Sequence, residues 1–210
     1  MTTKESLEKI NHQVANCQNC SLYKTATQPV PGNGQANSSI VFIGEAPGHH
    51  EDQQGIPFCG TSGKLLDKLL SQISLTRDQV FVTNILKHRP PENRDPQPEE
   101  INACTPFLRQ QLLVIKPKVI ITLGRFAMNF FLPHEYISQV HGQSRQIHWE
   151  GIDLTLYPVY HPAAAMRRIQ VSVDLEADFA KIPLLIQNTD QPKATVTKTV
   201  KKEPCQNSLF

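Results

Sequence analysis

Short apolar runs rich in β-branched residues alternate with helical patterns along this chain, and this alternation most constrains its fold. Such runs indicate buried strands when turn residues bound them. Strands that alternate with helices favour a parallel sheet with helices on both faces. We therefore expect an α/β fold, a three-layer α/β/α sandwich around a short, mainly parallel sheet. The predicted strands cover residues 39–44, 80–85, 119–123 and 154–160.

Apolar residues at helical spacing predict the helices between these strands. We expect a first helix over 3–16 and a helix through Leu65 to Ile73 that Ser62 caps. Residues 88–98 contain four prolines and should be irregular. The other helices are predicted over 98–115, 125–131 and 173–187, the last one interrupted or started afresh at Pro183.

Length and composition suggest one domain followed by a tail. The chain has 210 residues, of which 39% are hydrophobic, which is enough for a core. From about Asn188 the chain becomes polar and cannot bury enough surface to fold alone. We expect a domain over 1–187 and a disordered tail over 188–210. The sequence has no apolar run of membrane-spanning length and no signal-peptide core, so we expect a cytoplasmic protein. We also expect a monomer.

Charge gives little guidance to a partner. The net charge is +2, and the last 23 residues hold four lysines against two acidic residues. The remainder is therefore close to neutral, and any binding of nucleic acid by the domain must come from local basic clusters.

Two motifs follow two of the predicted strands, although more than a hundred residues separate them. Gly44-Glu45-Ala46-Pro47-Gly48 follows the first strand and leads to Glu51, Pro57 and Phe58, whereas Tyr160-His161-Pro162-Ala163-Ala164 follows the last. Ligands of parallel α/β sheets bind beyond the carboxyl ends of the strands. We therefore expect the two motifs to form one pocket.

The cysteines suggest a metal site or a cluster. Their number is five, which argues against a disulfide framework. Cys17-x-x-Cys20 follows the first predicted helix, and Cys104 lies in the helix predicted over 98–115. In a reducing cytosol, spaced cysteines more often bind a metal or a cluster. We expect Cys59 and Cys205 to be free.

The motifs, in this order and over about residues 15–185, resemble the iron–sulphur (family 4) uracil-DNA glycosylases of bacteria and archaea. The resemblance implies a uracil-DNA glycosylase-like fold and a monofunctional hydrolase of base excision repair, which releases uracil from DNA. It also implies a 4Fe-4S cluster on four cysteines, but the third position here is His88. We expect Cys17, Cys20, His88 and Cys104 to bind the cluster, with zinc, or a cluster lost or three-coordinate, as the alternatives.

The resemblance also assigns roles in the pocket, because such an enzyme must flip the nucleotide out, read its edge and stabilise the departing base. Phe58 would stack on the base and Asn84 would pair with its edge, while amides of the turn at Gly44 and Ala46 approach it. His161 would donate a hydrogen bond to uracil O2. Glu51, with Asp52 beside it, would orient or deprotonate the water, and Glu45 would hold the loop or assist electrostatically.

Basic residues flank this predicted pocket. Lys87, Arg89 and Arg94 border the proline-rich segment, and Arg167 and Arg168 follow the histidine motif. We expect phosphate contacts from these clusters, with Met166 and Arg167 filling the gap left by the flipped base.

Two other classes of function stay open. One is a relative that binds uracil-DNA without turnover, and the other is a nucleotide-binding α/β module that uses the turn from Gly44 to Gly48. This turn lacks the lysine and hydroxyl of a Walker motif. The last five residues, with Gln206, Leu209 and Phe210, resemble a peptide that binds the bacterial sliding clamp, so the clamp is a further expected partner.

Overall fold

A six-stranded mixed sheet forms the centre of the computed structural model, which describes residues 1–190. The strand order is β1-β3-β2-β4-β6-β5, and the four inner strands are parallel. The edge strands β1 and β5 are antiparallel to their neighbours. The strands are β1 (Asn33–Gly34), β2 (Ile40–Gly44), β3 (Phe81–Asn84), β4 (Val119–Leu123), β5 (Arg145–Trp149) and β6 (Ile152–Val159).

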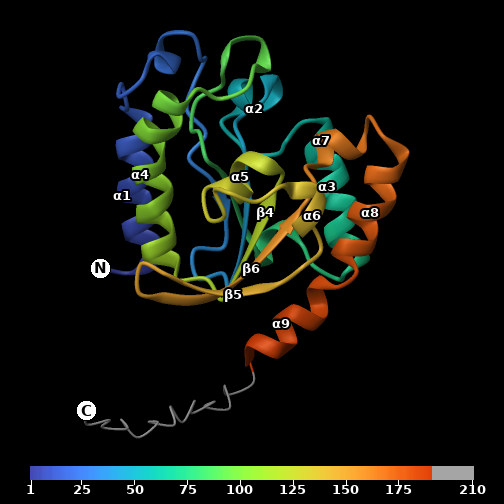
Figure 1. Cartoon of the computed structure of the whole chain (residues 1–210). Coiled ribbons are helices and arrows are strands. Elements are labelled where there is room, and N and C mark those ends of the chain that lie inside the picture. The colour runs from blue at the N-terminus through green and yellow to red at the C-terminus, as the bar shows by residue number, and fades with distance from the viewer. Residues whose placement is uncertain (191–210) are drawn as a thin grey trace, which may run out of the picture.

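The parallel strands are buried on both faces, so their side chains enter two separate cores. Val41 and Ile43 pack with α1 (Thr3–Ala15) and α4 (Pro98–Ile115). The alternate residue Phe42 packs with α3 (Thr61–Gln72) and α8 (Ile169–Phe179). This follows from the two-residue period of a strand. Figure 1 shows the two pairs of helices on opposite sides of the sheet, which confirms the predicted three-layer fold.

The long helices agree with their sequence patterns, with one correction at the start of α3, and the structure decides between the two alternatives at Pro183. Gly60, not Ser62, is the N-cap of α3, so Ser62 lies in the first turn. The predicted helix over 173–187 is two helices, α8 and α9 (Ile182–Asp190). Pro183 is the second residue of α9, where a helical N–H has no intrahelical partner, so proline starts this helix rather than interrupting one.

Short helices lie in the segments between the strands and the longer helices. The α-helices are α2 (His49–Gln54), α5 (Arg125–Asn129), α6 (Ile137–Val140) and α7 (Pro162–Ala165). The 3-10 helices are η1 (Ser21–Lys24), η2 (Arg77–Gln79) and η3 (Pro91–Asn93). Apart from η3, residues 88–97 contain no helix or strand, as their prolines predict.

The predicted tail begins near the end of the part that the structure describes. Helix α9 continues to Asp190, and residues 191–210, which include the proposed clamp-binding peptide, lie outside the described residues. Within residues 1–190, no helix is long and apolar enough to cross a membrane.

Candidate active site

Gly44 stands where three parts of the pocket meet. A Cβ atom on this residue would lie 2.3 Å from Oδ1 of Asn84 and 2.6 Å from Cζ of Phe58. Glycine is therefore required here because two side chains occupy the space beside its backbone. The strands β2 and β3 bring Gly44 and Asn84 together as register partners at their carboxyl ends.

Asn84 presents an unused acceptor to this pocket. The residue is 1% exposed, and its Oδ1 atom has no hydrogen-bond partner in the structure. An unsatisfied buried acceptor costs about 1–3 kcal/mol. A ligand that donates a hydrogen bond to Oδ1 would remove this cost, so Asn84 is placed to read a donor such as an imide N–H.

His161 is fixed in one tautomer at the start of α7. Its Nδ1 atom accepts a hydrogen bond from the backbone N–H of Ala163 over 3.1 Å. Burial lowers the pKa of His161 to about 4, although the nearby Glu51 carboxylate acts in the opposite direction. The imidazole is therefore neutral near pH 7, and its proton is on Nε2, where it is available to a ligand.

The His161 ring lies against the ring of Phe58. Their centroids are 5.5 Å apart and the ring planes differ by 30°. On its other side, a Cβ atom on Gly124, which follows β4, would lie 3.0 Å from the His161 Cβ. Asn84 and Phe58 therefore border Gly44, and His161 lies against Phe58, so these three residues, which the sequence predicted for the site, form one cluster.

Glu51 holds its carboxylate through the backbone. Oε2 accepts a hydrogen bond from the Gly48 N–H at 3.1 Å, and Oε1 accepts one from the Gly60 N–H at 2.8 Å. The residue is in α2 and is 7% exposed. Its carboxylate is thus preorganised beside His161, whose pKa it raises.

Asp52 does not join Glu51, contrary to the prediction from the sequence. Its Oδ1 atom accepts a hydrogen bond from the Thr27 N–H at 2.9 Å. The cause is the helical geometry of α2, in which consecutive side chains point in different directions. Burial lowers the pKa of His88, and the negative charge of Asp52 acts in the opposite direction. This carboxylate therefore belongs to the loop that also carries His88.

Glu45 is the most perturbed carboxylate of the site. Burial and then the charge of Asp95 raise the pKa of Glu45 to about 7, while Arg125 acts against this shift. Arg125 forms an ion pair with Asp95 at the rim. The sequence analysis did not single out Arg125, because nothing near it in the chain marks it as a neighbour of Glu45.

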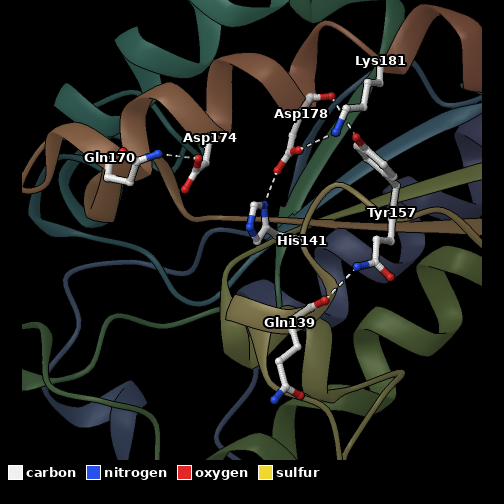
Figure 2. Close-up of polar contacts among 8 residues, drawn as sticks. Gln139, His141, Tyr157, Gln170, Asp174, Asp178 and Lys181 are labelled. Carbon is white, nitrogen blue, oxygen red and sulfur yellow. Dashed lines mark hydrogen bonds and ion pairs between the residues drawn. The ribbon is translucent and has the colours of Figure 1, made fainter.

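A polar network centred on Asp178, whose members His141 and Lys181 are seen in Figure 2, lies beside the turn that carries His161. The ring of Tyr160, directly before His161, lies 4.4 Å from that of His141. Nδ1 of His141 donates to Oδ2 of Asp178 at 2.7 Å, and Nζ of Lys181 donates to Oδ1 at 3.1 Å. These residues come from segments that no local motif connects, so the sequence analysis missed them.

Three thiols and one imidazole gather beyond the first helix. Cys17 and His88 border a cavity of about 270 Å³. Burial chiefly raises the pKa of Cys104 to about 11, and Cys20 and Cys17 raise it further. Within residues 1–190, no three His, Cys, Asp or Glu side chains are arranged to hold a single metal ion.

This arrangement fits a cluster better than one zinc ion. Zinc requires its sulfur and nitrogen ligands within about 2.0–2.3 Å of a single point. An iron–sulphur cluster instead takes separate ligands on separate irons, and histidine can replace cysteine. The donor set of Cys17, Cys20, His88 and Cys104 therefore fits a cluster in its chemistry and its common neighbourhood.

The basic residues named from the sequence differ in their availability. Lys87 is fully buried and cannot contact phosphate, because its Nζ donates to Thr83 Oγ1, Asn84 O and Gln111 Oε1. Arg94 donates two hydrogen bonds to the buried carboxylate of Glu100, at 2.6 and 2.9 Å.

The other rim residues remain accessible. Arg89 is half-buried and donates to Asn93 Oδ1 and to His49 Nδ1. Met166 is 51% exposed, and Arg167 and Arg168 beside it are exposed as well. This rim is therefore open to a ligand on the side where His161 begins α7.

Comparison with known proteins agrees with this geometry. The profile of the uracil DNA glycosylase superfamily matches residues 31–182. The type-4 uracil-DNA glycosylase of Sulfurisphaera tokodaii is 44% identical over 184 residues, which are 85% of this chain and 84% of that protein. The type-4 uracil-DNA glycosylase of Archaeoglobus fulgidus is 45% identical over 183 residues, which are 85% and 92% of the two chains.

In a more distant relative, the matching region is a small part of a much longer protein. A protein of Bacillus phage SP01 named DNA polymerase is 27% identical over 179 residues, which cover 85% of this chain but only 19% of the phage protein. Since the family profile covers most of the chain and the type-4 enzymes match it over nearly their whole length, this protein belongs to the uracil DNA glycosylase superfamily and, within it, to the type-4 uracil-DNA glycosylases.

Proposed function

We propose that this protein hydrolyses the N-glycosidic bond of uracil in DNA, releases the base and leaves an abasic site for base excision repair. The unpartnered Oδ1 of buried Asn84, beside Phe58 and His161, carries this proposal. Family membership supports the activity. The remaining assignments follow from the chemistry of each side chain.

Asn84 reads the base edge. The free Oδ1 accepts the N3–H of uracil, and the side-chain amide group donates to O4. Cytosine has no N3–H and carries a donor at the neighbouring position, so it leaves Oδ1 unpaired. Phe58 provides an apolar face for the extruded ring, and the main chain at Gly44 and Ala46 lies at the base.

His161 stabilises the departing base. Negative charge grows on uracil O2 as the glycosidic bond breaks, and the Nε2–H of the neutral imidazole donates to it. The bond from the Ala163 N–H to Nδ1 fixes this orientation before the reaction. One preorganised donor of this kind contributes about 3–4 kcal/mol to the transition state.

The two glutamates act on the sugar side. Glu51, held by two backbone N–H groups, orients the attacking water and accepts its proton as the bond to the anomeric carbon forms. Glu45, when ionised, stabilises the positive charge that grows on the sugar. The elevated pKa of Glu45 makes this contribution dependent on pH.

Contacts to DNA come from the rim. Arg89 and Arg167 bind phosphates, and Met166 fills the space that the flipped base leaves. Arg94 uses three of its five N–H donors on Glu100 and the Asp95 carbonyl oxygen, so its Nε–H and its second Nη2–H are left to contact phosphate.

Cys17, Cys20, His88 and Cys104 would hold a 4Fe-4S cluster, with one zinc ion as the alternative. Through His88, such a group would tie the proline-rich segment to Cys17 and Cys20. Lys87 connects this segment to the base pocket, because its N–H donates to Cys104 Sγ at 3.1 Å and its Nζ donates to Asn84 O at 2.8 Å. Burial lowers the pKa of His88, and the negative charge of Asp52 partly offsets this effect.

The end of the chain tethers the enzyme to a sliding clamp. Leu209 and Phe210 suit an apolar pocket and Gln206 suits its polar rim, which is a common mode of peptide recognition.

A single assay tests the activity. The protein is incubated with a duplex that contains one uracil, and alkali-labile sites are measured against a duplex with thymine at the same position. We expect strand cleavage after alkali only in the uracil duplex. Binding of the uracil duplex without cleavage would identify a non-turnover relative. If the protein neither binds nor cleaves the uracil duplex, the nucleotide-binding module remains as the alternative function.

A further inference from the structure

Phe58 has a backbone conformation that a phenylalanine rarely adopts. Its φ angle is +53°, in the left-handed region. For residues other than glycine this conformation is uncommon and persists only where the surrounding structure imposes it. Some contact must therefore hold the residue on which the position of the base depends.

Arg77, in η2, provides this contact from a distant part of the chain. Its Nη2 donates to the carbonyl oxygen of Phe58 at 2.9 Å and to that of Gly63 at 3.4 Å. Its Nε donates to Asp67 Oδ1, which orients the guanidinium. The planar fork of arginine thus joins the Phe58 backbone to helix α3.

Gly63 allows the Phe58 carbonyl to take this position. A Cβ atom on Gly63 would lie 1.7 Å from the Phe58 carbonyl oxygen. Any side chain there would displace the carbonyl from Arg77. The close approach of Gly63 and the hydrogen bond from Arg77 therefore depend on the same backbone geometry.

We propose that Arg77, oriented by Asp67, is a positioning residue that holds Phe58 against the extruded uracil. This inference rests on the proposed function, in which Phe58 stacks on the base. The Phe58 ring touches the space beside Gly44 and lies 5.5 Å from the ring of His161, so a shift of its backbone moves one wall of the pocket. Arg77 itself does not touch the base.

A cavity beside Phe58 gives this proposal a specific test. It has a volume of about 250 Å³, and Phe58, Cys59, Asp67 and Arg77 are among its lining residues. In the variant Arg77→Ala this cavity extends into the space of the lost guanidinium. A small cation such as methylguanidinium can then enter and donate to the Phe58 carbonyl.

The test compares single-turnover rates on saturating uracil-DNA. We expect Arg77→Ala to reduce the rate about 10- to 100-fold, because small displacements in an active site have effects of this size. Millimolar methylguanidinium should restore part of the rate, and Arg77→Lys should retain part of it. Arg145→Ala is the matched control, because it removes the ion pair between Arg145 and Glu135. The exposure of this pair is similar to that of Arg77 and Asp67, but Arg145 lies on the edge strand β5. It should leave the rate unchanged.

A double-mutant cycle separates positioning from general stability. In a Phe58→Ala background, Arg77→Ala should cause no further loss of rate, because the residue that it positions is already gone. Additive losses would overturn the proposal. A reduced salt dependence of DNA binding in Arg77→Ala would also overturn it, since Arg77 would then be a phosphate contact.

The outcomes also distinguish this inference from the proposed function. If the unmodified protein removes uracil and Arg77→Ala removes it at the same rate, the inference is wrong and the function stands. If the unmodified protein leaves uracil in place, the function itself fails. Should Arg77→Ala not fold, Arg77→Lys carries the test, and a rate in that variant equal to that of the unmodified protein contradicts the inference.

Discussion

The backbone N–H of Ala163 donates a hydrogen bond to Nδ1 of His161, two residues earlier, over 3.1 Å. This bond places the imidazole proton on Nε2 and orients the ring before any substrate binds. Proline follows His161 at the first position of α7, which places no N–H there to compete for the ring. The motif His-Pro-Ala thus determines both the position and the tautomer of the histidine.

The variants His161→Ala and Asn84→Ala should each reduce the single-turnover rate on uracil-DNA about 100- to 1000-fold, as loss of one preorganised donor typically does. Their affinity for DNA should change little, because phosphates supply most of it. His12→Ala, at an exposed position of α1, is the control for histidine loss. Rates near that of the unmodified protein in both site variants would contradict the assigned roles.

Asn84→Asp should shift the balance of activity towards cytosine. A carboxyl group replaces the amide that donates to uracil O4, and in its protonated form it can donate to cytosine N3. The ratio of rates on cytosine- and uracil-containing duplexes measures the change. An unchanged ratio would show that Asn84 does not read the base edge.

The reaction rate should rise with pH through about pH 7 as Glu45 ionises, because the pKa of Glu45 is about 7 and its carboxylate stabilises the growing charge on the sugar. His161, with a pKa of about 4, stays neutral over pH 5.5–9 and contributes no inflection there. Single-turnover rates across this range test the assignment. Glu45→Gln should lose the inflection, and an identical pH profile in that variant would assign it to another group.

Glu45 should also make folding stability depend on pH. The folded state binds the Glu45 proton more tightly than the unfolded state, whose ordinary value is 4.5. The free energy of unfolding contributed by this group is therefore full below about pH 4.5 and decreases as the pH rises to about 7. Urea unfolding at pH 5 and pH 8 measures this decrease, which should be smaller in Glu45→Gln than in the unmodified protein. A larger decrease in the variant would contradict the raised pKa of Glu45.

Protein purified without oxygen should be brown and contain iron and acid-labile sulphide. His88→Cys should retain the cluster at least as firmly, since thiolates are the usual ligands of such clusters. Cys59→Ser is the matched control, because Cys59 lies beside Phe58 in another cavity and should not affect the iron content. Colourless protein with one zinc per chain would replace the cluster by a zinc site.

Removal of Leu209 and Phe210 should abolish binding to a bacterial sliding clamp and leave the rate on naked uracil-DNA unchanged. Apolar anchors contribute most of the affinity in such peptides, whereas the pocket lies within residues 1–190. Surface-immobilised clamp provides the measurement. Equal binding by the intact and shortened proteins would remove the tether from the proposed function.

The sequence alone determined the parallel core of the sheet and the place of the pocket. Apolar runs such as Ile40 to Ile43 are long enough to specify buried strands, and turn residues at their carboxyl ends specify where ligands bind. Edge strand β5 escaped prediction because it alternates between half-buried and exposed residues, and because its pairing with β6 depends on the turn between them. Strand β1 has only two residues, which is too short for any periodicity.

Tertiary structure decided which side chains support the site. The motifs predicted Glu51, Phe58, Asn84 and His161 as site residues, since each lies in a local pattern that follows a strand. They did not identify Arg77, which holds Phe58, or His141 and Asp178, which lie beside the turn of His161. They also did not separate Asp52 from Glu51. A local pattern records the conformation of its own segment, whereas hydrogen bonds between distant segments exist only after packing has brought those segments together.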